Sequence, residues 1–365
     1  MHMFLLNFKI NQNMRQHLRT ALLFLITFSI ALPACKKKTI DEPTPPDPFD
    51  VYAAGREGYV AKYWKNGKAV NLGRAGVSSD ANAMVIAGND VHIAGYEVNA
   101  SGKYVAKYWK NGVSTSLTDG SRDAFANDIF IQGNDVYIAG QEMAPGKSTY
   151  QAKYWKNGTP VVLTDDTQSS IATGIALVGN DVYVIGERRN LDWLSPITVC
   201  WKNGQLFDLS EQTRTADNQA IAVSGNDLYL LWSETYNSAG QSQTRYSKNM
   251  GNPVLISNGT ADVRGYSIFV NGSDVYVAGS GTVNGNNAIV AKYWKNGSPV
   301  ILSNGPESAY ALSIAVSGAD VFAGGYRDGS NGKSGVAQYW KNGSVVQLTD
   351  GSASALLHKI IVIKK

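Results

Sequence analysis

One motif recurs through the chain from residue 51 to its end. AKYWKNG, or a variant of it, occurs seven times, and the intervals between its tryptophan positions are 45, 46, 46, 46, 47 and 46 residues. A second motif, GNDVYIAG with variants, precedes each copy after the first. Six matched intervals indicate one structural unit that is copied seven times. The tryptophan positions are Trp64, Trp109, Trp155, Trp201, Ser247, Trp294 and Trp340.

Each copy is expected to form four short β-strands. Residues 127–163 hold four runs rich in Val, Ile, Tyr and Trp, and Gly133-Asn134 and Asn157-Gly158 separate two pairs of them. Asn-Gly between apolar runs is the strongest signal for a two-residue hairpin turn, in which both turn residues take positive φ. No stretch after residue 35 shows helical periodicity. Four strands in about 46 residues predict an all-β fold, a β-propeller of four-stranded blades.

The two ends of the repeat region predict a closed ring. The region begins at residues 50–55 with the second strand of a unit and ends at 358–363 with a first strand. The C-terminal strand (358–363) should complete the first blade by pairing with the N-terminal strand from residue 51, with Ile361 beside it. This pairing closes a seven-bladed ring over residues 51–365 and removes the exposed edges of an open array. Because strands alternate in direction, tight turns lie on one face of the ring and longer connections on the other.

The N-terminal region has the composition of a secretion signal followed by a linker. Residues 1–34 carry three basic residues, no acidic residue and a 12-residue apolar run, which is too short to span a membrane and typical of a signal peptide. The run ends in Leu-Pro-Ala-Cys, which resembles the bacterial lipobox and implies that Cys35 is lipidated and becomes the mature N-terminus. Ordinary signal cleavage beside a chance cysteine is the alternative. Residues 35–50, with four prolines, are expected to form an extended tether.

Lipidation at Cys35 implies a location. Two or more acyl chains anchor a protein stably, so the expected partner is a membrane, bound through the N-terminal lipid, and the expected location is the cell envelope. No Asp follows Cys35, which resembles lipoproteins of the outer membrane. The side of the membrane, periplasmic or surface, and the oligomeric state stay open.

The basic net charge does not indicate a nucleic-acid partner. The chain has 33 Lys+Arg and 29 Asp+Glu, a net +4. Removing residues 1–34, with Lys9, Arg15 and Arg19, lowers this to +1 (4 − 3), and residues 51–365 keep 27 basic and 25 acidic residues. A net charge of +2 is too small to indicate binding to a phosphate backbone. We therefore expect no nucleic-acid partner.

The recurring residues are first explained by packing and turns. The Trp column is expected to pack between blades rather than to stack on a ligand. In the fifth copy, Trp232 is expected to fill the space left by Ser247. Aspartates recur after the Gly-Asn-type turns, and a second acidic turn recurs at Asp119, Asp165 and Asp350. Both are expected to accept backbone N–H groups of their turns. The first column is Asp50, Asp90, Asp135, Asp181, Asp227, Asp274 and Asp320.

The least repetitive connection, residues 187–194, supplies the candidate ligand-binding residues. It places Arg188 and Arg189 close to Trp193, and arginine with an aromatic residue is the composition of a binding hot spot. Tyr236 lies in the neighbouring connection, and Arg327 occupies the repeat position of Arg188 in the last copy. A purely structural loop is the alternative.

The sequence gives little support for an enzyme, and we expect neither a cofactor, a metal site nor catalytic residues. After the signal segment, the only histidines, His92 and His358, fall in different repeat positions, and Cys200 replaces a packed tyrosine. No nucleophile elbow, phosphate-binding loop or zinc-protease motif occurs. Carboxylates are plentiful, so a glycosidase or lyase pair stays open.

The repeats resemble those of bacterial extracellular β-propeller proteins. The pattern A-x-x-W-x-x-G-x-x-x-x-L, as in Ala152, Trp155, Gly158 and Leu163, is similar to the HAF-type extracellular repeat, although Thr-Asp-Gly follows where that family has a Leu-Gly-rich stretch. The resemblance implies the location and the fold, and it carries over no catalytic residue.

The function expected from the sequence is that of a membrane-anchored envelope lipoprotein. Its propeller would be a binding or scaffold head for a glycan, a peptide or an envelope protein. The alternative is a polysaccharide-active enzyme, a hydrolase or lyase, with acidic residues at the channel mouth. Mismatched acidic, arginine and aromatic residues at that mouth would favour the enzyme, and a repeat-symmetric loop face would favour the scaffold.

Overall fold

The computed structural model describes residues 47–189, 196–210, 215–235, 241–256, 262–283, 286–330 and 334–365. In these ranges the regular secondary structure is β-strand alone, and 28 strands form seven four-stranded antiparallel sheets. The predicted all-β, seven-bladed β-propeller is therefore confirmed. No helix long and apolar enough to cross a membrane occurs in the described ranges.

The first strand of each blade is the innermost, because these strands contact one another around the ring and line its central channel. In blade order they are β28 (Ala355–Lys364), β4 (Ser79–Ala87), β8 (Ala124–Gln132), β12 (Ser170–Val178), β16 (Thr215–Ser224), β20 (Val263–Asn271) and β24 (Ala309–Ser317). The second strands are β1 (Phe49–Glu57), β5 (Asp90–Val98), β9 (Asp135–Met143), β13 (Asp181–Arg189), β17 (Asp227–Thr235), β21 (Asp274–Val283) and β25 (Asp320–Arg327).

The outer half of each blade is a second hairpin. The third strands are β2 (Val60–Lys65), β6 (Tyr104–Lys110), β10 (Tyr150–Lys156), β14 (Pro196–Lys202), β18 (Ser242–Lys248), β22 (Asn286–Lys295) and β26 (Val336–Lys341). The outermost strands are short: β3 (Lys68–Asn71), β7 (Val113–Ser116), β11 (Thr159–Val162), β15 (Gln205–Asp208), β19 (Val254–Leu255), β23 (Ser298–Ile301) and β27 (Ser344–Gln347). Short edge strands limit pairing with other chains.

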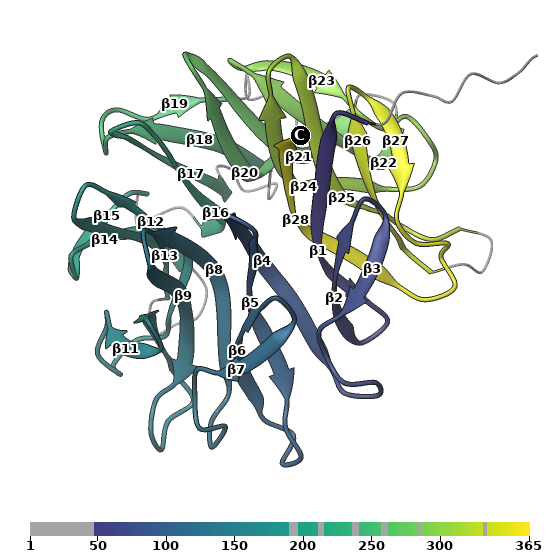
Figure 1. Cartoon of the computed structure of the whole chain (residues 1–365). Coiled ribbons are helices and arrows are strands. Elements are labelled where there is room, and N and C mark those ends of the chain that lie inside the picture. The colour runs from purple at the N-terminus through teal and green to yellow at the C-terminus, as the bar shows by residue number, and fades with distance from the viewer. Residues whose placement is uncertain are drawn as a thin grey trace, which may run out of the picture. The chain divides into compact units, whose positions relative to one another are not determined.

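The ring closes as predicted. β28 pairs antiparallel with β1, and Ile361 stands opposite Tyr52. Figure 1 shows these two strands, from opposite ends of the chain, side by side. The backbone N–H of Lys365 donates to the carbonyl of Pro48 and extends the pairing past the strand ends. Blade 1 therefore joins the two ends of the repeat region in one sheet.

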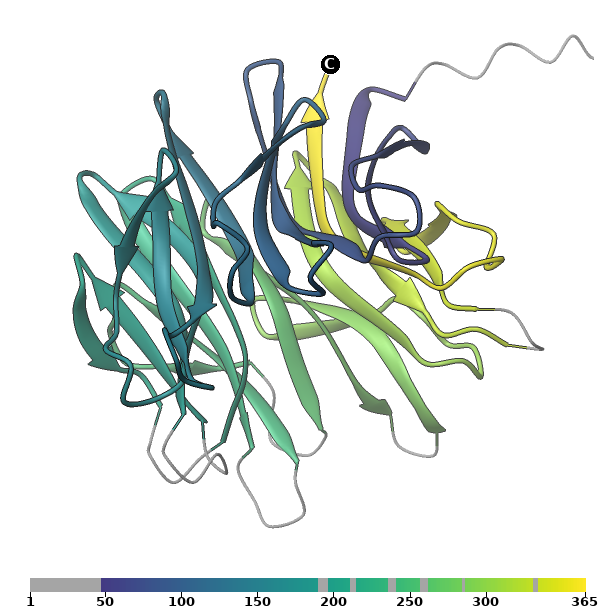
Figure 2. The same cartoon turned by 90° about the horizontal axis from the view of Figure 1, so that it is seen from below.

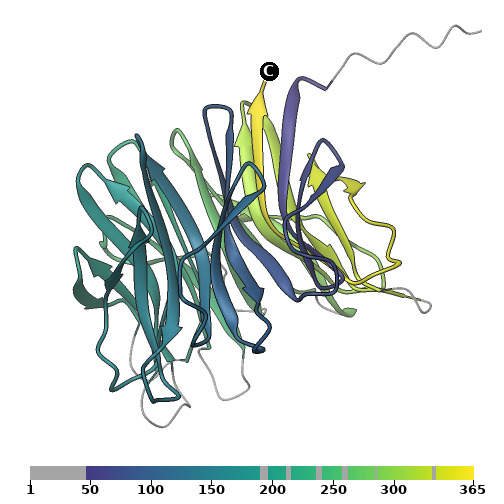
Figure 3. The ribbon, with the colours of Figure 1, turned by 60° about the horizontal axis from the view of Figure 1, so that its bottom comes forward.

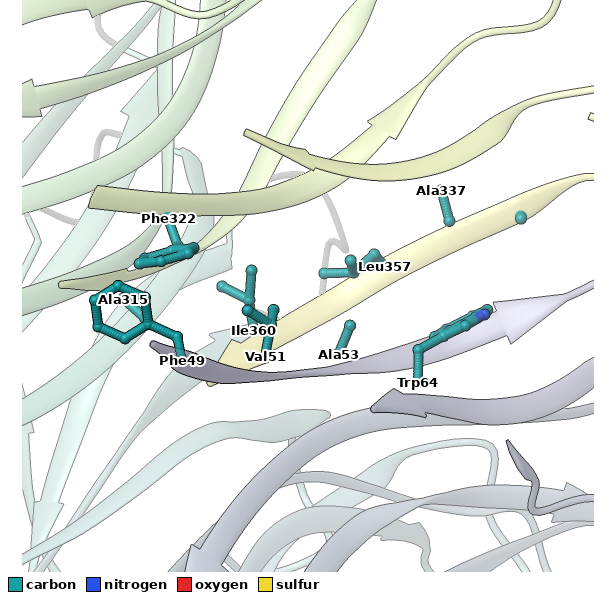
Figure 4. Close-up of a cluster of buried hydrophobic side chains, with 10 residues drawn as sticks. Phe49, Val51, Ala53, Trp64, Ala315, Phe322, Ala337, Leu357 and Ile360 are labelled. Atoms are coloured by element: carbon teal, nitrogen blue, oxygen red, sulfur yellow. The ribbon is translucent and has the colours of Figure 1, made fainter. Parts of the chain in front are cut away.

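The Trp column packs between blades, as expected. Trp64 is 1% exposed and lies with Phe322 of blade 7 and Ile360 of blade 1 in one buried cluster (Figure 4). The other tryptophans of the column are also buried, and each joins a cluster that spans two neighbouring blades. At about 25 cal/mol per Å² and about 200 Å² per ring, each contributes up to about 5 kcal/mol of transfer free energy.

The interface between blades 4 and 5 lacks a tryptophan in the column. Ser247 pairs with Leu230, and Trp232 lies two residues further along β17, so the pleat places Trp232 and Ser247 on one face of the sheet. Both are buried. Leu230 packs there with Ile185 and the Cys200 thiol of blade 4. The strand register therefore places both side chains on the same face, as is required if Trp232 fills the space left by Ser247.

A glycine column on the second strands allows a bulge in the first strands. A Cβ on Gly140 would lie 1.9 Å from the carbonyl oxygen of Phe125. Five further blades have the same close approach. In blade 5 Trp232 stands in this column, and its partner on the inner strand is Gln219, one residue later than the repeat predicts. The bulge therefore shifts where a Cβ is present. The glycines are Gly55, Gly95, Gly140, Gly186, Gly279 and Gly325.

The two hairpin turns of a blade differ in backbone conformation. In the outer turn both Asn157 (φ 50°) and Gly158 (φ 83°) have positive φ, as predicted for a type I′ turn. In the inner turn Gly133 has φ 59°, and Asn134 is not among the residues with positive φ. Glycine at the first turn position alone fits a type II′ turn.

A side-chain clip joins these two turns in every blade. In blade 3 the Nδ2 group of Asn157 donates to Oδ1 of Asp135 at 2.8 Å, and Asn157 Oδ1 accepts the N–H of Val136. All seven blades repeat both bonds. In blades 1 to 6 the preceding lysine also pairs with the aspartate at 2.7 to 3.7 Å. In blade 7 Lys341 pairs with Asp47.

The clip corrects one expectation about the aspartates and leaves another in place. The Asp135 column does not accept the N–H groups of its own turn, because it holds the asparagine and lysine of the neighbouring hairpin. The second acidic turn behaves as predicted. Asp119, Asp165 and Asp350 each accept the backbone N–H of the residue two positions later.

Substituting the glycine column should destabilise the ring. Gly140→Ala places a Cβ against the Phe125 carbonyl, so we expect a loss of about 2 kcal/mol or more in the free energy of unfolding. Gly335→Ala is the matched control, because the nearest atom to its Cβ would lie 3.4 Å away at negative φ. Denaturant unfolding measures both, and equal stability of the two variants would contradict a steric requirement for glycine at position 140.

The clips predict a loss of stability in acid. Hydrogen bonds from Asn157 and then Lys156 hold the pKa of Asp135 below its ordinary value, and five other clip aspartates are lowered in the same way. A lowered folded-state pKa stabilises the fold above the unfolded value, about 3.9, and this contribution disappears as the pH falls through the folded value. Thermal unfolding between pH 6 and 2 should show it. Asp135→Asn should make the dependence shallower than in the unsubstituted protein.

Candidate functional site: the loop face, the channel mouth and a cavity between blades 3 and 4

The residues on one face of the propeller differ more from blade to blade than the residues on the other face. We call the face that carries the clips the turn face, and the face that carries the longer connections the loop face. Seven similar clips make the turn face uniform. Figure 2 and Figure 3 show the end of β28 and the start of β1 together on one face, which is the turn face. The loop face is where neighbouring blades differ.

The central channel is narrow and polar. Its cavity of about 120 Å³ is lined by the inner strands, where the bulged position carries asparagine in blades 2 and 3 and other side chains in the remaining blades. Asn82 donates to the Ala126 carbonyl of the next blade at 2.9 Å, and Asn127 donates to Ala172 at 2.8 Å. These side chains hold neighbouring blades together, so the channel lining is first of all structural.

Asp128 is a titratable group in this channel. Its carboxylate accepts the N–H of Ile175 in blade 4 at 3.0 Å. Burial raises the pKa of Asp128, and the charge of Lys359, which also lines the channel, opposes that rise only in part. Asp128 is thus a carboxylate placed to take up a proton inside the ring.

The channel mouth carries a charged cluster between blades 1 and 2. Arg56 Nε lies 3.0 Å from Asp80 Oδ2, and His358 Nε2 lies 3.2 Å from the same oxygen. A histidine oriented by a carboxylate is an arrangement used in general acid–base chemistry. In blade 7, Tyr310 of β24 and Tyr326 of β25 stack with ring centroids 4.8 Å apart. The mouth is therefore not repeat-symmetric, which favours the enzyme alternative over a plain scaffold.

An aromatic cluster covers the loop ends of blades 2 and 3. Tyr96, Tyr104 and Phe125 have ring centroids 4.9 to 5.3 Å apart, and Tyr150 follows at 6.2 Å from Phe125. Tyr104 is 37% exposed. We call these four residues the aromatic cluster. Burial raises the pKa of Tyr96 and Tyr150, so their hydroxyls remain protonated donors at neutral pH.

The structure does not bring the predicted ligand-binding residues together. Arg188 lines a cavity of about 320 Å³ between blades 3 and 4. Arg189 is paired with Glu187 at 2.7 Å. Arg327 lies in blade 7, separated from blade 4 by two blades, and donates to the carbonyl of Asp328. Trp193, Tyr236 and Cys35 fall outside the described residues.

Sequence reasoning missed the aromatic cluster and the Arg56–Asp80–His358 group. One signal could have pointed to them. The second residue of the inner strand varies from repeat to repeat, whereas the clip and tryptophan positions hardly vary. Aligning the repeats there gives Asp80, Phe125, Ile171, Arg264, Tyr310 and Leu356.

The described ranges contain no group of three His, Cys, Asp or Glu side chains that could hold a metal ion. Burial raises the pKa of the Cys200 thiol to about 12, so this thiol is not a nucleophile at neutral pH. The expectations of no metal and no cofactor stay predictions.

Comparison with known proteins identifies the fold but no family. Neither a family model nor a curated protein matches the chain, so the HAF-type resemblance and the lipoprotein identity stay predictions. A puromycin-hydrolyzing peptidase from Mycobacterium tuberculosis is 11% identical, with a TM-score of 0.57 over 84% of this chain and 52% of that one. An acylaminoacyl peptidase from Pyrococcus horikoshii is 10% identical, with a TM-score of 0.50 over 85% and 52%.

A third structure, an acylaminoacyl peptidase in complex with Z-Gly-Gly-Phe-chloromethyl ketone, gives 10% identity and a TM-score of 0.51 over 85% and 52%. The chain thus spans about half the length of these peptidases. Our prediction that the chain is not an enzyme is contradicted, because the same fold forms part of enzymes and cannot argue against activity. By structure, the chain is a seven-bladed β-propeller similar to the part of these peptidases that it covers.

Proposed function

We propose that this protein is a lipid-anchored component of the bacterial cell envelope whose loop face binds a carbohydrate chain. The observation that carries the proposal is the aromatic cluster. Aromatic rings offer flat apolar surfaces with a polar rim, which complement the apolar face and the peripheral hydroxyls of a sugar ring. The four rings come from four strands of two blades, β5, β6, β8 and β10, and the centroid of each lies within 6.2 Å of another.

The position of the chain entry supports this arrangement. The propeller begins on the turn face, where Lys341 holds Asp47 at 3.0 Å. Asp47 follows Cys35 by 12 residues, which reach about 40 Å at full extension. A lipid on Cys35 would therefore tether the turn face and leave the loop face open to ligands.

A second candidate function is enzymatic action on the bound chain. The Arg56–Asp80–His358 group at the channel mouth favours it, because it places a histidine, a carboxylate and a cation within hydrogen-bonding distance. Polysaccharides should be tested as substrates, and peptides should be tested as well, because solved structures of similar fold are peptidases.

Polysaccharide binding tests the main proposal. The full-length protein in detergent should bind envelope polysaccharides on a glycan array. Tyr104→Ala should weaken the binding about tenfold, which corresponds to about 1.4 kcal/mol for one aromatic contact. Tyr59→Ala is the control, because Tyr59 is 72% exposed and lies outside the aromatic cluster. Equal effects of the two substitutions, or no binding at all, would refute the proposal.

Membrane attachment is tested separately. In a bacterial host the unsubstituted protein should fractionate with membranes and incorporate labelled palmitate, whereas Cys35→Ala should do neither. Palmitate labelling of the Cys35→Ala variant would show that the anchor lies elsewhere.

A further inference from the structure

A second binding site emerges when the blades are compared with one another at one position. In blades 1, 2, 3 and 5 the second strand carries a glutamate two residues after the glycine column, in which blade 5 has Trp232. Each of these glutamates forms an ion pair with a lysine or arginine. The pairs are Glu57 with Lys62, Glu97 with Arg74, Glu142 with Arg122 and Lys153, and Glu234 with Arg245. In blade 4 the same position is Arg188. The usual carboxylate is therefore replaced by a cation.

Blade 3 shows what fills this space when the carboxylate is present. Glu142 is buried, Arg122 donates to its Oε1 at 2.8 Å, and Lys153 donates to Oε2. One repeat later, the residues at these three positions are Arg188, Gln168 and Val199. Blade 4 therefore has one cation, Arg188, at the position where blade 3 has its carboxylate, and it has no carboxylate at the three compared positions.

The space around Arg188 is open. The segment that leads from β11 to β12 and the strands β13, β14 and β15 of blade 4 together line a cavity of about 320 Å³. This volume accommodates a single sugar or amino-acid residue. Its lining includes Leu163, Asp165, Ser170, Arg188, Trp201 and Leu206.

Buried donors line this cavity without acceptors. Among the described residues, no partner is found for Arg188 Nε, for Trp201 Nε1 or for the hydroxyl of Ser170, which is 1% exposed. In blade 3 the position of Ser170 is Ala124, and in blade 2 it is Ser79, whose hydroxyl accepts the N–H of Ala61. Unmade hydrogen bonds of buried donors are costly, and a ligand carrying oxygen acceptors would satisfy them.

Two carboxylates near Arg188 restrict the ligand. Asp208 lies 3.4 Å from Arg188 Nη2 at the exposed rim, a distance at which the pairing is weak. Asp165 lines the cavity, and hydrogen bonds from Thr167 keep its pKa low, so it is charged and accepts hydrogen bonds at neutral pH. A ligand must therefore present an anion to Arg188 and hydroxyl donors to Asp165.

We propose that the cavity between blades 3 and 4 binds a hexuronic acid residue. Its carboxylate would accept hydrogen bonds from Arg188, Ser170 and Trp201, and its ring hydroxyls would donate to Asp165. Leu163, Leu206 and the Trp201 ring supply the apolar wall. The site rests on its own geometry, and it holds whether or not the aromatic cluster binds a longer chain.

Calorimetry on the full-length protein in detergent tests the site directly. Glucuronate and galacturonate should bind at least tenfold more tightly than glucose and galactose. Arg188→Gln should weaken uronate binding at least tenfold, since a charge-assisted bond to carboxylate is lost. Ser170→Ala should weaken it a few-fold. Arg74→Gln is the matched control, because Arg74 is an exposed arginine that pairs with Glu97 in another blade. The uronate affinity of this variant should be unchanged.

Several outcomes would overturn the assignment. Equal binding of sulfate would show a general anion site, and binding of N-acetylated amino acids without uronates would show a different ligand class. Absence of uronate binding, or binding that survives Arg188→Gln, would refute the site. If Arg188→Gln fails to fold, Ser170→Val gives the answer, because the larger side chain narrows the cavity from a position that does not carry charge.

Discussion

Pairing between β28 and β1 is the contact on which the other interfaces depend. Each blade packs through both sheet faces, so a blade at the end of an open row would leave one apolar face in water. Because residues 355–364 pair with residues 49–57, no such face remains. The tryptophans can then be buried between every pair of neighbouring blades except blades 4 and 5, where Ser247 stands in the column and Leu230 packs with Ile185 and Cys200.

The ring leaves its two faces under different physical constraints. On the turn face, the left-handed turns are Asn-Gly in six blades and Asn249-Met250 in blade 5, and the clips use Asp and Asn in all seven, so this face varies little. On the loop face, the connections cross from the outer strand of one blade to the inner strand of the next. Their backbone is held by Asx turns such as that of Asp165, and their other side chains are free to differ. The aromatic cluster, the Arg56–Asp80–His358 group and the cavity at Arg188 all lie where this freedom exists.

The sequence predicted the architecture well because each of its signals is local or periodic. The interval of 46 residues, the Asn157-Gly158 turn type and the phase of the chain ends require no knowledge of side-chain contacts. The partner of Asp135 could not be predicted in this way. Its clip joins residues 22 positions apart, and the turn chemistry of Gly133-Asn134 alone suggested a different acceptor role. The sequence indicates Arg188 because its connection combines arginines with a tryptophan. Only the comparison of blades in three dimensions shows that Arg188 replaces a carboxylate and lines a cavity.

The sequence by itself determined the number of blades, the strand content and the closure of the ring, because these follow from period and phase. It also determined a small net charge outside the signal segment. Only the tertiary structure decided which side chains meet on the loop face. Tyr104 and Phe125 touch because neighbouring blades converge there, although they belong to different repeats. The cavity at Arg188 exists because a carboxylate, its two cations and an alanine of blade 3 are all replaced in blade 4, and these positions become adjacent only when the sheet and its covering segment are folded together.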